Sequence, residues 1–359
     1  MRVKLEDVCE RGSSNLKQSD VIDKEGEYPV YGAAGYLGSV DFYHQEKPYV
    51  AVVKDGAGIG RTTLYLSKSS VIGTMQYLLP KENVLPEYLC YVVRYMHLEK
   101  YFTGATIPHI YFKDYKNEEF NLDTIDRQVE IVDILKKVEN IIELCRQELE
   151  KFDDLIRARF VELFGDPIYN TNNIPIKHLD DIGVWASGGT PSRTVPQYFE
   201  GDINWYSAGE LNSLFLEGSI EKITEDAIEK SAAKLFKAGS MLVGMYDTAA
   251  FKMGILKEDS ASNQACACIT PNDEVNIVWL YYELQFMKEY FLSQRRGVRQ
   301  KNLNLRMIKG FEIPVADRRK QDKFVNFVTQ VDKSKVAVQE ALEKAQLLFD
   351  SLMQKYFGQ

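Results

Sequence analysis

Residues 128–164 read QVEIVDILKKVENIIELCRQELEKFDDLIRARFVELF, and this stretch decides the fold. Its apolar side chains recur at alternating steps of four and three residues, which is the heptad spacing of a long helix that packs lengthwise on another helix. Gly165 and Pro167 follow directly and favour a helix end there. The seam predicted by this spacing includes Ile131, Leu135, Val138, Ile142, Leu149, Phe152 and Ile156.

The same seam recurs 193 residues later, in residues 321–357, QDKFVNFVTQVDKSKVAVQEALEKAQLLFDSLMQKYF. Gln128 matches Gln321 at this offset, and Gly104 matches Gly297. Ungapped agreement at one offset predicts internal duplication, whereas two unrelated amphipathic helices would not explain it. The second seam includes Phe324, Val328, Val331, Val338, Leu342, Phe349 and Leu352.

The segments before the two long helices are also alike, and each predicts one α/β unit. Strand-like residues 28–32 correspond to residues 203–207, and the helix predicted over Pro86 to Tyr101 corresponds to one over Val278 to Leu292. The offset drifts from about 174 to 193 residues, so the second copy carries extra loop residues.

We therefore predict an α/β (α+β) fold. Two similar globular domains are separated by two long antiparallel coiled-coil helices, and the halves form a pseudo-twofold internal repeat. The predicted boundaries are residues 1–122 for the first globular domain, 123–167 for the first helix, 168–315 for the second globular domain and 316–359 for the second helix.

Composition excludes several classes of protein. The 359 residues carry a net charge of −8, which argues weakly against broad non-specific binding to polyanions. Five cysteines without a CxxC pair predict a reduced cytoplasmic protein with no zinc site. The sequence shows no apolar leader and no apolar run of spanning length, so we expect no membrane. Four histidines form no HExxH motif, and we expect neither a metal site nor a catalytic centre.

A glycine-rich turn, DGAGIGR at residues 55–61, is the first candidate contact with a ligand. It fails the P-loop and dinucleotide patterns, because an acid or Arg61 stands where a glycine is needed. A tight turn that approaches the DNA backbone fits better, with Lys54, Arg61, Thr62 and Thr63 as donors to phosphate oxygens. The alternative is an ordinary turn with solvated charges.

A basic stretch between residues 290 and 310 contains no acid. Arginine and lysine neutralise phosphates, whereas Asn, Gln and Arg can pair with base edges. The alternative interpretation of this stretch is a solvated charged face. A second segment, GGTPSR at residues 188–193, mixes turn residues with hydroxyls and a guanidinium, and it is either a phosphate clamp or a plain loop. In the basic stretch, the candidate DNA contacts are Arg295, Arg296, Arg299, Gln300, Lys301, Asn302 and Arg306. The equivalent, less basic stretch of the first half offers Thr106, His109 and Lys113. The remaining candidates are Thr190, Ser192 and Arg193 of residues 188–193, and Tyr31, Tyr206 and Lys252.

With these residues in view, the chain resembles the DNA-specificity (S) subunit of Type I restriction–modification systems. Each motif alone is weak, but their order, given twice, is specific. The resemblance rests on the GGTPSR run at 188–193 that leads to INW at 203–205, and on its first-half counterpart YPVYG at 28–32. Further similar features are DGA at 55–57, NQAC at 263–266, Gly297 with Gln300, and DRQ at 126–128, which leads into the first long helix.

The resemblance implies two target recognition domains, each reading one half of a bipartite double-stranded DNA sequence. The long helices would be the family's spacer regions and would dock two methyltransferase subunits, which carry S-adenosylmethionine and methylate adenine. Restriction subunits, which use ATP and Mg, can add translocation and cleavage in this host-defence system. The chain itself would hold no cofactor and catalyse nothing.

Two other classes of function stay open at this point. A methyltransferase or nuclease with its own recognition domains would need a cofactor fold, and about 120 residues per globular half leave little room for it. Methyl transfer by the purified chain alone would favour that class. A coiled-coil adaptor that does not bind DNA would instead bind a small ligand tightly without DNA.

Overall fold

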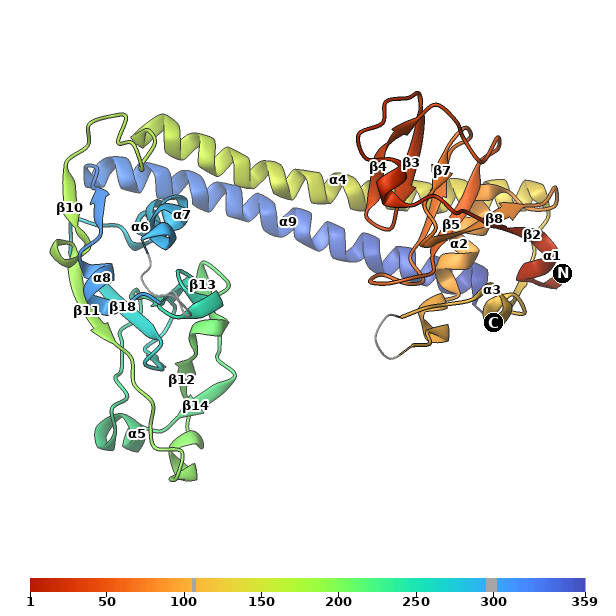
Figure 1. The fold of residues 1–359 in the computed structure, drawn as a ribbon. Coiled ribbons are helices and arrows are strands. Elements are labelled where there is room, and N and C mark those ends of the chain that lie inside the picture. The colour runs from red at the N-terminus through yellow and green to blue at the C-terminus, as the bar shows by residue number, and fades with distance from the viewer. Residues whose placement is uncertain (105–107, 295–301, 359) are drawn as a thin grey trace. The chain divides into compact units, whose positions relative to one another are not determined.

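The computed structural model describes residues 1–104, 108–294 and 302–358. The chain divides into two compact units: unit 1 is Met1–Glu148 with Val338–Gln359, and unit 2 is Leu149–Ala337. Each unit contains one part of each of two helices of 40 residues, α4 (Ile125–Phe164) and α9 (Arg318–Phe357), drawn yellow to green and blue in Figure 1. The two long helices and the two globular parts predicted from the sequence are confirmed.

Unit 1 contains a four-stranded antiparallel sheet in the order β2-β8-β5-β6, a three-stranded sheet in the order β4-β3-β7 and the pair β1-β9. The strands are β1 (Arg2–Lys4), β2 (Cys9–Ser13), β3 (Tyr28–Gly32), β4 (Gly35–Val40), β5 (Tyr49–Val53), β6 (Thr62–Tyr65), β7 (Ser70–Val71), β8 (Met75–Pro80) and β9 (Glu119–Asn121). The helices are α1 (Leu5–Val8), α2 (Pro86–Tyr95) and α3 (Phe112–Tyr115), with short 3-10 turns η1 (Gln18–Asp20) and η2 (Leu98–Tyr101).

Unit 2 repeats this plan with the orders β11-β18-β15-β16-β13, β14-β12-β17 and β10-β19. Strand β13 and helix α5 are additions that unit 1 does not show among its described residues. The strands are β10 (Ile176–His178), β11 (Gly183–Ser187), β12 (Ile203–Tyr206), β13 (Phe215–Leu216), β14 (Glu221–Ile223), β15 (Met241–Gly244), β16 (Met253–Leu256), β17 (Ala261–Ser262), β18 (Cys266–Pro271) and β19 (Glu312–Pro314). The helices are α5 (Glu225–Lys230), α6 (Ile277–Phe286), α7 (Lys288–Ser293) and α8 (Leu305–Lys309), with 3-10 turns η3 (Leu179–Asp181), η4 (Pro196–Phe199), η5 (Ala208–Glu210) and η6 (Asp247–Ala249).

Two helices predicted from the sequence differ in the structure: one ends earlier, and the other is interrupted. The helix expected over Pro86 to Tyr101 ends at Tyr95, because His97 adopts a left-handed conformation with φ 50°, which a right-handed helix cannot contain. Its counterpart divides into α6 and α7 at Met287, where the backbone turns to φ −91° and ψ 0°. Apolar periodicity continues through both breaks, so periodicity alone could not locate them.

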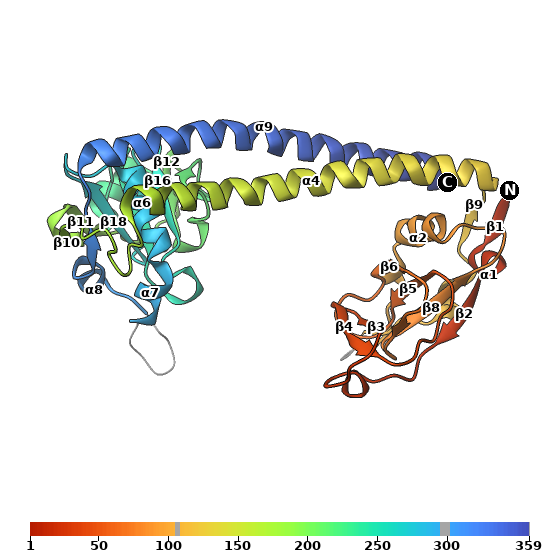
Figure 2. The same ribbon diagram turned by 90° about the horizontal axis from the view of Figure 1, so that it is seen from above.

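In each unit one helix lies between the sheet and the long helices. In unit 1 a single apolar cluster joins Leu89 of α2 to Val50 of β5, Leu135 of α4 and Phe357 of α9, and Figure 2 shows α2 between them. In unit 2, α6 takes this place, and its Trp279 belongs to the same cluster as strand, α4 and α9 residues. The helix pair is therefore part of both cores.

The predicted seam lies at the contact between α4 and α9 in both units. In unit 1, Val138 and Ile142 pack with Ala345. In unit 2, Phe160 stacks edge-on against Phe324 at a centroid distance of 5.3 Å. The buried seam residues are Ile131, Leu135, Val138, Ile142, Ile156, Phe324, Val328 and Val331, and the partly buried ones are Leu149, Phe152, Val338, Leu342, Phe349 and Leu352.

Among the described residues, no helix is both long and apolar enough to cross a membrane.

Candidate nucleic-acid interface

The glycine-rich turn of unit 1 follows β5 and is closed by its backbone. Gly60 N donates to the Val53 carbonyl and Val53 N donates to the Arg61 carbonyl, both at 2.9 Å. Gly60 has φ 80°, and a Cβ there would lie 2.7 Å from a backbone nitrogen of η2, so this position requires glycine. The turn is thus fixed in shape and ends at Arg61, whose side chain is exposed.

A second loop is tied to this turn. Ile110 N donates to the Lys54 carbonyl at 2.9 Å, and the Nδ1 atom of His109 lies 2.6 Å from a carboxylate oxygen of Asp55. Both side chains of the His109–Asp55 pair stay about one-third exposed. The structure therefore brings Lys54, Arg61 and His109, which are far apart in the sequence, to one edge of unit 1.

An exposed tyrosine that the sequence analysis did not select extends this edge. The Tyr111 ring is stacked near the His109 ring, with a centroid distance of 6.3 Å and an interplanar angle of 22°. Lys113 Nζ lies 5.3 Å from the Tyr111 ring centroid. The available signal was an aromatic residue placed two positions from each of two candidates. Exposed aromatic and cationic groups side by side suit nucleic acid, since bases stack and phosphates pair with cations.

The other described candidates of unit 1 are buried or half-buried. Tyr31 is half-buried and stacks on Tyr65 at 4.2 Å, and Thr62 is buried, with its hydroxyl donating to the Gly60 carbonyl at 3.0 Å. Thr63 is half-buried on β6. Thr106 lies outside the described residues.

Unit 2 contains the same backbone frame. Gly244 N donates to the Lys252 carbonyl at 2.8 Å, and Phe251 N donates to the Gly244 carbonyl at 2.9 Å. Lys252 therefore occupies the place of Arg61, and Phe251, with φ 57°, occupies the place of Gly60. Lys252 Nζ donates to a side-chain oxygen 2.9 Å away in the loop after η5.

The basic stretch of unit 2 is only partly described. Leu303 N donates to the Met245 carbonyl at 2.8 Å, which repeats the bond of Ile110 in unit 1. Asn302 is half-buried, and Arg306 is exposed on α8. The predicted contacts Arg295, Arg296, Arg299, Gln300 and Lys301 lie outside the described residues.

Arg193, a predicted phosphate contact, is already engaged within unit 2. Its Nη2 donates to a Glu221 carboxylate oxygen at 2.8 Å, and this bond raises the pKa of the guanidinium. The guanidinium carbon lies 4.2 Å from the Phe199 ring centroid and 5.3 Å from that of Trp205. To contact a phosphate, Arg193 would have to share or leave these partners.

The remaining candidates of unit 2 are also placed. The Thr190 hydroxyl donates to the Gln264 side chain, Ser192 Oγ lies 2.8 Å from a neighbouring threonine hydroxyl, and Tyr206 is buried. Within the described ranges, no group of three or more His, Cys, Asp or Glu side chains is arranged to hold a metal ion.

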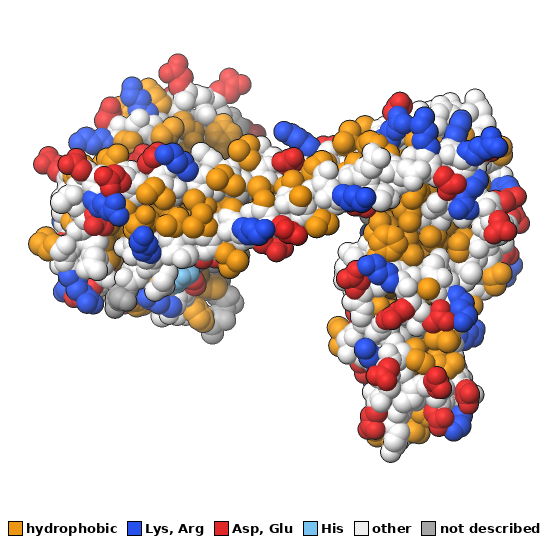
Figure 3. Space-filling view, turned by 180° about the vertical axis from the view of Figure 1, so that it is seen from behind, with side chains coloured by type: hydrophobic (Ala, Val, Ile, Leu, Met, Phe, Trp, Pro, Cys, Tyr) orange, Lys and Arg blue, Asp and Glu red, His pale blue; other side chains and the backbone are white. Residues whose placement is uncertain are grey.

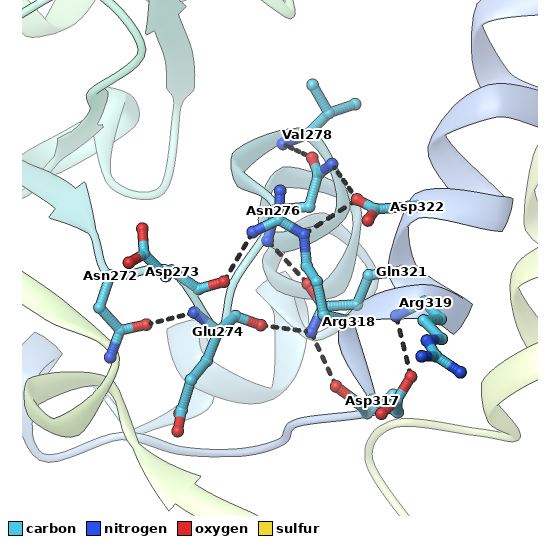
Figure 4. A network of polar contacts seen from close by, with 11 residues as sticks. Asn272, Asp273, Glu274, Asn276, Val278, Asp317, Arg318, Arg319, Gln321 and Asp322 are labelled. Atoms are coloured by element: carbon cyan, nitrogen blue, oxygen red, sulfur yellow. Dashed lines mark hydrogen bonds and ion pairs between the residues drawn. The ribbon is translucent and has the colours of Figure 1, made fainter.

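A buried glutamine joins the long helix of unit 2 to its globular part. Asn276 N donates to Gln321 Oε1 at 2.7 Å, and Gln321 Nε2 donates to the Glu274 carbonyl at 3.1 Å and the Ala316 carbonyl at 2.8 Å (Figure 4). Gln321 is fully buried, so these three bonds are shielded from water. Asn276 caps α6, and the glutamine therefore fixes the start of α6 to the start of α9.

Unit 1 repeats this glutamine joint. Leu85 N donates to Gln128 Oε1 at 2.8 Å, and Gln128 Nε2 donates to the Asn83 carbonyl at 3.0 Å and the Asp123 carbonyl at 2.9 Å. Gln128 is also fully buried. The match of Gln128 with Gln321 in the sequence marks the repeat, but the role of the two glutamines as joints is visible only in the structure.

A family model described as the Type I restriction modification DNA specificity domain matches residues 1–152 and 173–347. The chain is 24% identical over 225 residues to the Type I restriction enzyme EcoR124I/EcoR124II specificity subunit of Escherichia coli, which covers 60% of this chain and 54% of that protein. It is 28% identical over 180 residues to the Type I restriction enzyme MjaIX specificity subunit of Methanocaldococcus jannaschii, and this match covers 48% of this chain and 41% of that protein. The chain spans about half the length of these curated relatives.

Two solved structures share the fold. The S subunit of a Type I restriction–modification system from M. genitalium matches with a TM-score of 0.64 at 15% identity, covering 99% of this chain and 96% of that one. A chain from a study of assembly and conformational transition in the type I R-M system matches with a TM-score of 0.55 at 14% identity, covering 99% and 97%. At these identities the two likenesses concern the fold alone.

Proposed function

We propose, from the premise that the chain belongs to the Type I restriction modification DNA specificity family, that it reads DNA sequence through its two globular units and leaves catalysis to other subunits. The observation that carries the proposal is the duplicated loop frame. In each unit a strand enters a turn closed by the same pair of backbone bonds, and the turn ends in a cation, Arg61 or Lys252. A second loop is tied beside each turn.

The chemistry of the unit 1 edge supports contact with both the phosphate backbone and the bases of DNA. Arg61, Lys54 and Lys113 are suited to phosphate oxygens, which set the position of a protein on a duplex. His109 and Tyr111 offer hydrogen-bonding groups and a flat ring to base edges. The net charge of −8 places this local cationic edge on an acidic chain, so binding would depend on local contacts rather than on overall charge.

A bipartite target follows from two units that repeat one another. Each unit would read one half-site, and the stretch of DNA between the half-sites would go unread. Helices α4 and α9 each contribute residues to both units, which supports their role as the spacer regions between the two readers. The loops differ between the units, so we expect the two half-sites to differ.

Exposed apolar side chains on the helices of unit 1 support a scaffolding role. On α4, Ile141 is 49% and Leu144 is 63% exposed, and on α9, Leu347 is 70% and Leu348 is 50% exposed. Exposed large apolar side chains on both helices are typical of a surface that a partner covers. We propose two methyltransferase subunits as the partners, with S-adenosylmethionine on them, and ATP and Mg on any restriction subunits. We expect the assembly in the cytoplasm, with no membrane partner.

The test is selection from random duplex DNA by the chain assembled with methyltransferase subunits. We expect enrichment of two short, different motifs separated by a gap of constant length. A single unbroken motif would contradict the split target, and absence of any enrichment would contradict DNA reading. Methyl transfer by the purified chain alone would favour the enzyme alternative, which the proposal excludes.

A further inference from the structure

In unit 1, α2 supplies an arginine to an acid on the long helix. Arg94 Nη1 lies 2.9 Å from Glu139 Oε1, and the Tyr91 hydroxyl donates to the other oxygen of the same carboxylate. The guanidinium carbon of Arg94 lies 5.7 Å from the Tyr91 ring centroid. A carboxylate and an aromatic ring thus hold one cation at the junction of α2 and α4.

Unit 2 keeps the acid and the aromatic ring and loses the arginine. Alignment of α2 with α6, fixed by the two glutamine joints, places Tyr282 at the position of Tyr91 and Gln285 at that of Arg94. The repeat offset of 193 places Asp332 on α9 at the position of Glu139. Within the described part of the chain, the Asp332 carboxylate makes no hydrogen bond or ion pair, and burial raises its pKa although Lys335 acts in the opposite direction.

An open groove of about 830 Å³ lies in front of Asp332. Tyr281, Tyr282 and Phe286 of α6 form its aromatic wall, and Phe215 of β13 forms part of the opposite wall. Figure 3 shows hydrophobic side chains gathered on unit 2 beside the long helices. Strand β13 belongs to the addition between β12 and β14; the equivalent strands β3 and β4 of unit 1 are joined by a tight turn, so the groove is a product of that addition.

The charges along the groove leave one acid without a partner. Lys335 pairs with Asp153, and Lys257 pairs with Glu217 on the β13 side. After these two pairs, Asp332 is the charge that an occupant must match. A planar guanidinium suits the site best, because it can pair with a carboxylate and stack on an aromatic ring at the same time.

We propose that this groove receives an arginine side chain from the methyltransferase subunit, which Asp332 and Tyr282 hold as Glu139 and Tyr91 hold Arg94 in unit 1. The inference rests on the proposed function, since it requires that subunit to dock on this chain. It makes the two units unequal: unit 1 completes its own site, whereas unit 2 takes the missing cation from a partner.

The experiment measures the affinity of the purified full chain for the purified methyltransferase subunit. Asp332→Asn keeps the shape and removes the charge, and should weaken assembly about tenfold or more, as expected when one member of a buried charge pair is lost. The double variant Gln285→Arg/Asp332→Glu rebuilds the unit 1 arrangement and should also weaken assembly, because the chain then fills its own groove. Asp154→Asn, at an exposed acid of α4, is the matched control and should change affinity less than about twofold.

Folding is checked by tryptophan fluorescence, since Trp185, Trp205 and Trp279 all lie in unit 2. Neither Asp332→Asn nor Gln285→Arg/Asp332→Glu should lower the unfolding midpoint. A direct readout is modification of arginines by phenylglyoxal, followed by mass spectrometry. One arginine of the methyltransferase subunit should be protected in the complex with the unmodified chain and become reactive with Asp332→Asn.

The outcomes separate this inference from the function on which it rests. If the unmodified chain and both variants assemble equally tightly, the groove is not the arginine site, while the scaffolding role stands. Protection of no arginine of the methyltransferase subunit would likewise overturn it. If the unmodified chain itself fails to bind the methyltransferase subunit, the scaffolding role falls and this inference falls with it.

Discussion

Unit 1 and unit 2 share their backbone ties and differ in the side chains around them. Both close the turn after the central strand with the same two backbone bonds, and both fix the long helix with a buried glutamine. At matched positions of the repeat, however, unit 1 has Gly60 where unit 2 has Phe251, and Val92 where unit 2 has Glu283. The comparison indicates that duplication preserved the hydrogen bonds that define the frame, while single residues diverged wherever the frame tolerated them.

The largest expected effect concerns the shared element, the buried glutamine. Gln321→Leu would leave the Asn276 N–H and two carbonyls without their partner, and a buried unsatisfied group costs about 1–3 kcal/mol. We expect unit 2 to lose about 3 kcal/mol or more, seen as a lower denaturation midpoint by tryptophan fluorescence. Hydrogen exchange at the Asn276 amide should accelerate.

Gln128→Leu is the matched control in the other unit. It should cost unit 1 a similar amount and accelerate exchange at the Leu85 amide. The tryptophan midpoint should stay unchanged, because all three tryptophans lie in unit 2. If Gln128→Leu shifts that midpoint as much as Gln321→Leu does, the units unfold together and the glutamine joints are not independent.

The next effect concerns Glu283, a buried acid at the position of Val92. One of its carboxylate oxygens has no hydrogen-bond partner in the structure, and burial raises its pKa well above the ordinary 4.5. Above pH 4.5 the unfolded chain releases this proton while the folded chain retains it, so stability falls as pH rises toward the folded pKa. Glu283→Val should therefore stabilise unit 2, by about 2 kcal/mol at pH 7.

The pH dependence is the decisive measurement for Glu283. The gain from Glu283→Val, measured by tryptophan fluorescence, should be smaller at pH 5 than at pH 7 or 8. Glu283→Gln, which cannot ionise, should show the same flattened pH profile. A gain that does not change with pH would mean that shape rather than charge explains the effect.

A smaller effect is expected at the turn itself. Gly60→Ala adds a Cβ that meets a backbone nitrogen at 2.7 Å and forces alanine into a left-handed conformation, which costs about 1–2 kcal/mol. Gly218→Ala, with φ 75° and nothing within 4 Å of its Cβ, carries the conformational cost without the clash. Thermal unfolding should rank Gly60→Ala as the more damaging change, and equal losses would remove the clash from the explanation.

The sequence predicted the repeated elements far better than the details of the site. Heptad spacing and a constant offset located both long helices, because a seam of apolar residues is directly visible in one chain. The turn at Gly60 was recognised from its glycines, but its ties to Ile110 and His109 depend on loops that are distant in the sequence. Arg193 was selected by residue type, and its engagement with Glu221 could not be read from spacing.

The smallest expected effect tests whether the two frames contact DNA in the same way. Arg61 and Lys252 occupy matched positions, so Arg61→Ala and Lys252→Ala should each remove about one phosphate contact. Each should reduce the slope of log affinity against log salt by about 1 for the assembled complex on its selected DNA. Such a loss should be similar for every sequence, whereas Tyr111→Ala should relax selectivity at one half-site only. If Arg61→Ala lowers the slope and Lys252→Ala does not, unit 2 contacts the backbone through other residues, and the shared frame does not extend to the DNA.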